Sequence, residues 1–226
     1  MEKTLFDRRS FVAGAAVLTV GWSTIACAQQ PRLFRPEDFG AAGNGRTDDT
    51  QAIQRCIDAA GEGATISLRQ GAVYRIDTNY QVTSERFGGI KLRNGQTLAL
   101  NGAELKALPT NAGHGAVVQA YGTHGWRIQG PGTITGEKDI HRGKGGEWGM
   151  GVLAFAANDW SIGPGVRIHN CWGDGIYVGG ERRVGDFCHR FVIDGVEVFN
   201  CRRNGISVIG GRDGEIRRVN IYDIAG

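Results

Sequence analysis

A short segment that occurs three times constrains the fold of this chain more than any other sequence feature. Its copies are residues 148–154 (WGMGVLA), 172–178 (WGDGIYV) and 202–208 (RRNGISV). A second motif, an alternating apolar strand followed by Asn-Cys, recurs between them at residues 166–171 (VRIHNC) and 196–201 (VEVFNC). Self-similarity with a period of about 20 to 50 residues is typical of a solenoid, because each repeat buries its apolar face against the next. We therefore predict a coil of stacked strands.

Stacked repeats place equivalent residues in columns. Met150, Asp174 and Asn204 occupy the same position of the first motif, so we expect them about 4.8 Å apart per rung if the strands pair in parallel. Cys171 and Cys201 occupy equivalent positions of the second motif and are expected to stack inside the coil as small apolar residues. A disulfide between them is the alternative, because an exported protein can form such a bond.

Glycine is unusually abundant and supports this architecture. The chain has 37 glycines among 226 residues, whereas the average content is about 7%. The absence of a Gly-X-Y period excludes a collagen helix, and the glycines instead fit many tight turns between short strands. The net charge is only +3 and the basic residues are scattered, so we expect no nucleic-acid partner.

The N-terminus has the features of an export signal, which we predict over residues 1–28. Arg8 and Arg9 precede an apolar, alanine-rich stretch that ends in Ala-Cys-Ala. A basic segment, an apolar segment and a small-x-small end are typical of a secretory signal, and the paired arginines resemble a twin-arginine signal. An ordinary secretory signal and a lipoprotein signal are the alternatives.

The remaining chain divides into a linker and one folded domain. Residues 29–36 are predicted to be an extended linker and residues 37–226 the domain. No second apolar run is long enough to cross a bilayer, so we expect a periplasmic or extracellular protein without a membrane span. The last predicted strand is not covered by any later segment, and an unpaired strand edge favours association. We therefore expect a chain that is truncated at its C-terminus and able to oligomerise through that end.

One amphipathic helix is expected near the start of the domain. Residues 47–50 (TDDT) open it, with Thr47 or Asp48 as the N-terminal cap, and apolar residues then recur at spacings of three and four up to Ala60. Gly61 ends the helix. Nearly all of the remaining domain is predicted to be short strands between Gly, Asn and Pro turns.

Two polar insertions interrupt the repeat. They are residues 137–146 (EKDIHRGKGG) and 181–189 (ERRVGDFCH). We predict that both are loops that leave the coil, and insertions of this kind often line the binding face of a solenoid.

About forty residues at the start of the domain carry a family resemblance. Residues 38–60 (DFGAAGNGRTDDTQAIQRCIDAA), followed by a strand and by residues 71–76 (GAVYRI), resemble the N-terminal signature of the pectate-lyase superfamily. This superfamily includes polygalacturonase- and rhamnogalacturonase-like hydrolases, alginate epimerases and phage tailspikes. The resemblance implies an all-β, right-handed parallel β-helix with an N-terminal capping helix, and a polysaccharide substrate. Asn170 and Asn200 resemble the asparagine ladder of such coils, in which side-chain amides stack along a turn.

The hydrolases of this superfamily imply a candidate acid. Their successive rungs resemble Asn-Thr-Asp-Gly, Gly-Asp-Asp-Cys-Ile and Gly-His-Gly-Ile-Ser-Ile, and GDGI and NGISV of this chain are similar to the last two. Asp174 matches the acidic rung, whereas Met150 and Asn204 stand where an acid and a histidine are expected. Glycosidic hydrolysis normally needs two carboxyl groups, so we predict Asp174 as catalytic with Glu147, in the preceding rung, as its partner. Asp186 in the second insertion is the next candidate partner.

A lyase or an epimerase would need different groups. A base must take the proton next to a uronate carboxylate, and a cation must neutralise that carboxylate. Arg202 and Arg203 could bind a uronate through bidentate hydrogen bonds, and His141 and Tyr177 are candidate acid or base groups. Ca²⁺ is a cofactor expected only for this alternative. The Asp-Pro-His motif of the alginate epimerases is absent, because Tyr-Val-Gly stands in the equivalent strand.

Two tryptophans occupy equivalent positions of the repeat. They are expected to stack in register, either as a platform for a sugar ring or as packed edges of two rungs. The full set of predicted substrate-binding residues is Trp148, Trp172, Arg202, Arg203, Asn204, Tyr177 and His141.

The favoured function is that of a secreted, glycoside hydrolase-like enzyme that cleaves a pectin- or uronate-type polysaccharide without a metal or another cofactor. One alternative is a polysaccharide lyase or uronate epimerase. The other is a non-catalytic carbohydrate-binding or adhesive β-helix, or an inactive fragment.

Overall fold

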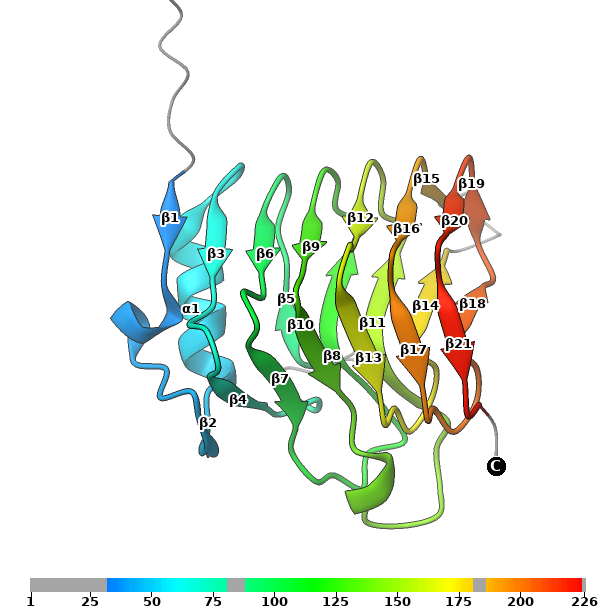
Figure 1. The fold of residues 1–226 in the computed structure, drawn as a ribbon, viewed down its shortest axis with the longest axis horizontal. Coiled ribbons are helices and arrows are strands. Elements are labelled where there is room, and N and C mark those ends of the chain that lie inside the picture. The colour runs from blue at the N-terminus through cyan, green and yellow to red at the C-terminus, as the bar shows by residue number, and fades with distance from the viewer. Residues whose placement is uncertain (1–31, 81–87, 181–185, 225–226) are drawn as a thin grey trace, which may run out of the picture. The chain divides into compact units, whose positions relative to one another are not determined.

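Short parallel strands follow one another around a common coil in the computed structural model (Figure 1), which describes residues 32–80, 88–180 and 186–224. The middle turns of the coil each contribute one strand to each of three sheets, whereas the turns with β1 and β2 and with β20 and β21 contribute to two, and all the strand pairs are parallel (for example β10 with β13 and β11 with β14). Strands that are neighbours in a sheet are separated along the chain by strands of the other two sheets, which is the topology of a parallel β-helix. The predicted fold class is therefore confirmed.

The chain enters the three sheets in the order first, second and third. The first sheet contains β1 (Leu33–Phe34), β3 (Thr65–Ser67), β6 (Thr97–Ala99), β9 (Arg127–Gln129), β12 (Ser161–Ile162), β16 (Val192–Asp194) and β20 (Glu215–Arg217). The second sheet contains β2 (Asn44–Asp48), β4 (Val73–Ile76), β7 (Glu104–Ala107), β10 (Gly132–Thr135), β13 (Val166–His169), β17 (Glu197–Phe199) and β21 (Asn220–Tyr222). The third sheet contains β5 (Ile90–Lys91), β8 (His114–Tyr121), β11 (Trp148–Phe155), β14 (Ile176–Gly179) and β18 (Ile206–Val208). The pair β15 (Cys188–His189) and β19 (Gly211–Arg212) forms a fourth, two-stranded sheet.

The core is built from columns of inward-facing side chains. In the second sheet, Ile134 pairs with Ile168, which in turn pairs with Val198, and all three are fully buried. Each buried aliphatic side chain of this kind stabilises the fold by about 1.5–3 kcal/mol relative to exposure. Trp160 lies within the core between the rings of Trp126 and Phe191, with ring-centroid distances of 4.7 and 4.8 Å. Equivalent side chains of successive rungs therefore stack on each other and stabilise the coil.

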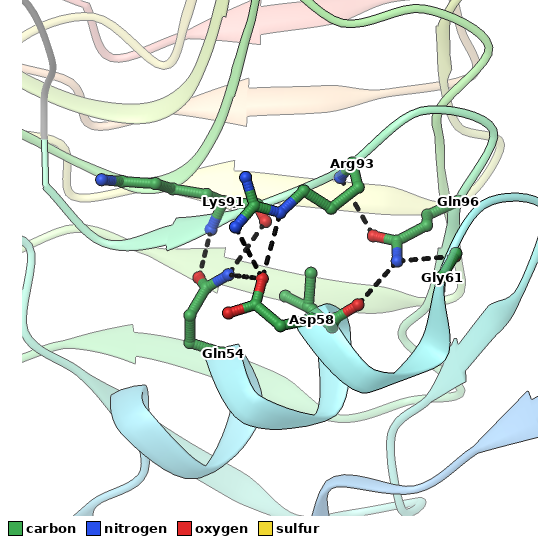
Figure 2. A network of polar contacts seen from close by, with 7 residues as sticks. Gln54, Asp58, Gly61, Lys91, Arg93 and Gln96 are labelled. Atoms are coloured by element: carbon green, nitrogen blue, oxygen red, sulfur yellow. Dashed lines mark hydrogen bonds and ion pairs between the residues drawn. The ribbon is translucent and has the colours of Figure 1, made fainter.

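Helix α1 (Thr50–Ala60) is joined to the coil by side-chain amides (Figure 2). Gln54 accepts a hydrogen bond from the backbone N–H of Lys91 at 2.8 Å. Gln96 donates to the backbone oxygens of Ile57 and Gly61 at 2.8 and 2.9 Å, so it satisfies two carbonyls at the helix C-terminus. The helix packs beside β1, β3, β4 and β5, and its role as a cap remains a prediction.

The helix begins slightly later than the sequence indicated. Residues Asn44–Asp48 form β2, and α1 starts at Thr50. The N-cap residue is Asp49 rather than the predicted Thr47 or Asp48, and its side chain makes no capping hydrogen bond. Asp48, one position earlier, accepts the backbone N–H of Thr50 on Oδ1 at 3.0 Å. The carboxylate of Asp49 instead accepts backbone N–H groups of Ala42 and Gly43 at 2.6 and 3.1 Å. This buried carboxylate therefore holds the loop before β2.

The first insertion is only partly a loop that leaves the coil. The 3-10 helix η2 (Lys138–Ile140) lies beyond the strand ends in Figure 1. Lys138 Nζ donates to Asn200 Oδ1 at 2.8 Å, and Asp139 Oδ2 accepts Asn170 Nδ2 at 2.5 Å. Asn170 and Asn200 also hydrogen-bond to each other, as the predicted ladder requires. The start of the insertion is thus fastened to two residues of the ladder.

Other predictions need correction at the level of single elements. Residues 33 and 34, inside the predicted linker, form β1 and pair with β3. Cys188 and His189, inside the second predicted loop, form β15 and pair with β19, because the coil gains a short fourth side there. Residues 181–185 and the predicted export signal lie outside the described residues. No helix in the described ranges is long and apolar enough to span a bilayer.

The cysteines follow the interior packing expected of them. Cys56, Cys171, Cys188 and Cys201 are buried and unbridged. The stacking of Cys171 and Cys201 as free thiols is therefore the arrangement found.

Candidate active site

The predicted column of residues lies where the chain enters the strands of the third sheet. Val152 pairs with Ile176 and Ile176 with Ile206, so the residues two positions before each of them are also in register. The backbone N–H of Asp174 points at Met150 Sδ at 3.4 Å, and that of Asn204 donates to Asp174 Oδ1 at 3.1 Å. Met150, Asp174 and Asn204 therefore form one column.

Close packing of the rungs explains why glycines flank Asp174. A Cβ on Gly173 would lie 2.5 Å from the backbone oxygen of Glu147. A Cβ on Gly175 would lie 2.3 Å from Val198 Cγ1 and 2.6 Å from the backbone oxygen of Gly205. Real side chains do not tolerate such distances, so the Gly-Asp-Gly sequence holds the carboxylate between two closely spaced rungs.

One guanidinium connects the two predicted catalytic carboxylates. Arg203 Nε lies 3.9 Å from Asp174 Oδ1, and Arg203 Nη1 lies 3.5 Å from Glu147 Oε2. The side chains differ greatly in exposure, with 1% for Asp174 and 59% for Glu147. Asn204 Nδ2 also donates to Asp174 Oδ1 at 3.2 Å. A buried carboxylate requires such partners, because its desolvation is otherwise too costly.

Two aromatic side chains border this charged cluster. The rings of Trp148 and Tyr177 lie 5.9 Å apart at an angle of 49°, and the guanidinium carbon of Arg203 is 5.9 Å from the Trp148 ring. Burial raises the pKa of the Tyr177 phenol, the nearby charge of Asp174 raises it further, and Arg203 opposes both effects. Tyr177 is therefore a neutral phenol at neutral pH. Trp148 is 41% exposed.

The remaining predicted site residues form a separate cluster around Trp172. The His141 ring stacks on Trp172 at 3.9 Å, and the guanidinium carbon of Arg202 lies 4.1 Å from the Trp172 ring. Arg202 Nη1 donates to the backbone oxygen of Gly146 at 2.9 Å. These contacts hold the first insertion against the coil. Trp148 and Trp172 do not stack on each other anywhere in the described ranges, so the predicted register of the two rings is wrong.

A buried carboxylate in this second cluster was missed by the sequence analysis. Glu137 lies 2.8 and 2.9 Å from His141 Nδ1 through its two oxygens, and both side chains are almost fully buried. Burial raises the pKa of the Glu137 carboxyl, and the hydrogen bond and charge of His141 oppose that rise. The four-residue spacing of the pair was the only signal in the sequence. The burial of the pair depends on later rungs, because the His141 ring stacks on Trp172, which Arg202 contacts in turn.

The structure thus divides the predicted residues into two groups. Asp174, Glu147, Arg203, Asn204, Trp148 and Tyr177 surround one point on the outer face of the third sheet. His141, Trp172 and Arg202 lie in the insertion cluster instead. The candidate acid Asp186 lines a hollow together with Gly122 and Ala156. These two residues follow the C-terminal ends of β8 and β11, whereas the column of Asp174 lies where the chain enters the strands of this sheet. Within the described ranges, no group of three or more His, Cys, Asp or Glu side chains is placed to hold a metal ion.

Comparison with known proteins identifies the fold of the chain. No family model matches the chain. In the structures that resemble it, the A-module of a mannuronan C-5 epimerase from Azotobacter vinelandii superposes with a TM-score of 0.61 at 20% identity, over 84% of this chain and 51% of the module. An endo-xylogalacturonan hydrolase from Aspergillus tubingensis has a TM-score of 0.61 at 15% identity, over 84% of this chain and 51% of the hydrolase. The chain has the pectin-lyase-like fold.

Further similarities agree with the pectin-lyase-like fold. A putative glycosyl hydrolase from Parabacteroides merdae has a TM-score of 0.55 at 16% identity, over 85% of this chain and 97% of that protein. A segment of 51 residues, 22% of this chain, is 43% identical to the capsule KN3-specific depolymerase 1 of Klebsiella phage KN3-1. That segment is only 6% of the depolymerase. The chain also spans about half the length of the epimerase module and of the xylogalacturonan hydrolase.

Proposed function

We propose that this protein is a polysaccharide-active enzyme that hydrolyses a pectin- or uronate-type chain, with Asp174 and Glu147 as its carboxyl pair. The observation that carries the proposal is the position of Arg203, whose guanidinium lies 3.9 Å from Asp174 and 3.5 Å from Glu147. Proteins that share the fold include a xylogalacturonan hydrolase and a mannuronan epimerase, which agrees with an acidic polysaccharide as substrate.

The two carboxyl groups differ in exposure, and this difference suits different catalytic roles. Asp174 is buried, and its contacts with Asn204 and Arg203 all reach Oδ1, so we assign Oδ2 the proton that passes to the leaving oxygen. Glu147 is mostly exposed and assists by activating water. A substrate carboxylate that reaches Arg203 competes with Glu147 for the guanidinium and releases Glu147 for this task. The arrangement therefore favours an acidic sugar over a neutral one.

Elimination or epimerisation is a second candidate, favoured by Tyr177. The phenol is neutral, because burial and the charge of Asp174 raise its pKa, and it lies beside the ring of Trp148 at the edge of the charged cluster. In this chemistry the Glu147 carboxylate takes the proton next to the uronate carboxylate, and Arg203 neutralises that carboxylate. The neutral phenol then donates a proton to the leaving oxygen or, in epimerisation, back to the carbon. Ca²⁺ is a cofactor only of this alternative.

Product analysis separates these chemistries. The protein is incubated with polygalacturonate, xylogalacturonan and alginate, and new reducing ends are measured together with the ultraviolet absorbance of unsaturated uronates. New reducing ends without absorbance support hydrolysis, whereas absorbance that rises with them overturns hydrolysis in favour of elimination. A change in uronate stereochemistry without cleavage identifies an epimerase. Binding without any product identifies a carbohydrate-binding β-helix.

A pair of Asp→Asn variants tests the role of Asp174. Asp174→Asn keeps the shape of the side chain and is expected to abolish turnover while polymer binding remains. Asp159→Asn is the matched control, because Asp159 is exposed and pairs with Arg190 away from the site. Equal turnover of Asp174→Asn and the parent protein would remove Asp174 from the mechanism.

We also propose that the protein is exported through residues 1–28 and works in the periplasm or outside the cell. A reporter fused behind residues 1–36 is expected to leave the cytoplasm, and the double change Arg8→Lys and Arg9→Lys is expected to stop it. Export of the doubly changed fusion would instead indicate an ordinary secretory signal.

Self-association is proposed through the end of the coil that carries β20 and β21. Ile216 and Ile221 pair with the buried residues Ile193 and Val198, yet they are exposed themselves. Light scattering over a range of concentrations should show oligomers that Ile221→Asp weakens. A monomer at every concentration would exclude this contact.

A further inference from the structure

The outer face of the third sheet carries a continuous run of aromatic rings. Tyr121 at the end of β8 stacks on Phe155 at the end of β11, with ring centroids 4.9 Å apart and planes at 5°. Next to Phe155, in register on β14, stands Gly179. A Cβ on Gly179 would lie 2.4 Å from Tyr177 Cε1 and 2.8 Å from Phe155 Cδ2, so both rings cover this glycine. Tyr177 in turn contacts Trp148 beside Asp174.

An apolar layer on the outside of the coil supports these rings. Ala116, Met150 and Leu153 are buried but belong to a cluster separate from the interior core. Phe155 and Tyr177 pack against this cluster from its solvent side. The rings are therefore held in place by packing, and Tyr121 at the outer end remains 38% exposed. A fixed and exposed ring face loses little entropy when a ligand covers it.

Two hollows with polar lining residues lie near the stacked pair, one lined by Tyr121 itself and one by the residues that follow Tyr121 and Phe155 in the chain. One, of about 90 Å³, is lined by Tyr121 together with Lys91, Leu92, Arg93, Gln119 and Thr123. The other, of about 270 Å³, is lined by Gly122, Ala156, Asn158, Asp186, Phe187 and His189. Gly122 and Ala156 directly follow the two aromatic residues in the chain. Because the two rings stack face to face, the Tyr121 ring that lines the first hollow is the surface a ligand can reach. An apolar ring beside polar side chains suits a sugar ring, which has an apolar face and a rim of hydroxyl groups.

We infer that Tyr121 and Phe155 form a distal sugar-binding subsite, so that the protein binds a segment of several sugars across the third sheet rather than a single chain end. Trp148 and Phe155 are the two ends of β11, roughly 20 Å apart at about 3.3 Å per residue. A polymer that stacks on both ends must extend past Asp174 by more than one sugar residue. This inference rests on the proposed function, because it takes the ligand to be an acidic polysaccharide.

Binding as a function of oligomer length tests the subsite. Calorimetry measures the Kd of short and long oligogalacturonates and oligomannuronates for the full chain carrying Asp174→Asn, so that no ligand is cleaved. Tyr121→Ala and, separately, Phe155→Leu are then added. Tyr222→Ala is the matched control, because Tyr222 is 37% exposed and lies on the second sheet. Circular dichroism checks that each variant is folded.

Affinity for the long oligomers is expected to fall roughly 5- to 10-fold in Tyr121→Ala, with a loss in the same direction in Phe155→Leu. Affinity for the shortest oligomers should not change, and Tyr222→Ala should bind like the parent. Unchanged long-oligomer affinity in Tyr121→Ala, or an equal loss for short and long oligomers, overturns the subsite. A parent chain that binds no uronate oligomer overturns the proposed function and the subsite together. Length-dependent binding that needs Tyr121, without turnover by the wild-type chain, overturns only the proposed hydrolysis.

Discussion

Arg203 places its Nε 3.9 Å from the buried Oδ1 of Asp174 while its side chain remains one-third exposed. The carboxylate is thus neutralised from the solvent side, where a ligand arrives. Any anionic group that binds Arg203 also changes the electrostatic surroundings of Asp174. Substrate binding and the state of the candidate acid are coupled through this one side chain.

Two variants of Arg203 should therefore distinguish the contribution of its charge to stability from that of its packing. Arg203→Met leaves the Asp174 carboxylate without its cation and should destabilise the fold by about 1–3 kcal/mol, less than for a fully buried pair because water screens the guanidinium. Arg203→Lys keeps the charge and should lose less. Urea denaturation of the two variants measures the difference. Equal stability of Arg203→Met and the wild type would show that the pair contributes nothing.

Gly175→Ala should be costly because the added methyl group has no room. Its Cβ would lie 2.3 Å from Val198 Cγ1 and 2.6 Å from a backbone oxygen. Overpacking of this kind typically costs about 1–3 kcal/mol, and a backbone contact cannot yield easily. Gly145→Ala is the control, since a Cβ there meets nothing within 4 Å. Thermal denaturation of both variants tests the contrast, and similar melting temperatures would contradict it.

The buried pair of Glu137 and His141 predicts a pH dependence of stability. Burial raises the pKa of Glu137 above its ordinary value of 4.5, so the folded state holds this proton more tightly than the unfolded state does. The contribution of Glu137 is therefore most favourable below pH 4.5 and is lost as the pH rises through the folded-state pKa. In Glu137→Gln this loss is absent.

Denaturation of the wild type and Glu137→Gln across the weakly acidic and neutral range measures that difference. The free energy of unfolding of the wild type should fall relative to that of the variant as the pH increases. Parallel curves would mean that Glu137 has the same pKa in both states. Asp58→Asn, on an exposed carboxylate of α1, provides the control.

The cysteines should be unreactive in the folded protein. Burial, reinforced by the charges of Asp38 and Glu37, raises the pKa of the Cys56 thiol to about 12, so almost no thiolate exists at neutral pH. Cys171, Cys188 and Cys201 are buried as well. With the fifth cysteine, Cys27, replaced by serine, a thiol reagent should label none of these four in the native state and all four in denaturant without a reductant. Only two labelled thiols in denaturant would reveal a disulfide.

The repeats were sufficient to predict the parallel coil and the column at Asp174. Register follows from the spacing of Gly-Ile pairs, because inward-facing residues such as Ile176 and Ile206 cannot shift without exposing the core. Strand β2 escaped prediction because its residues are polar and largely exposed, and only pairing with β4 gives it an extended form. Strands β15 and β19 have two residues each, too few for an alternating pattern.

The site was predicted less completely than the fold, for a physical reason. Asp174 lies inside a repeat, so its neighbours follow from the period. His141 and Trp172 come from an insertion and a rung, and their contact depends on the path of the insertion, which no periodicity describes. The burial of Glu137 likewise depends on residues of later rungs. The aromatic pair of Tyr121 and Phe155 was missed because β8 precedes the recognised repeats and Phe155 lies one position beyond the first copy, so no period aligned the two rings.

The first insertion is tied to two rungs at once, through Asp139 to Asn170 and through Lys138 to Asn200. Solenoids evolve by gain and loss of whole repeats, and most rungs of this coil contact only the rungs on either side. A repeat added between Asn170 and Asn200 would separate the two anchors by one more rung and break one of them. Duplication is therefore restricted at this place, and the part of the coil that carries Asp174 has a fixed number of rungs for as long as the insertion is retained.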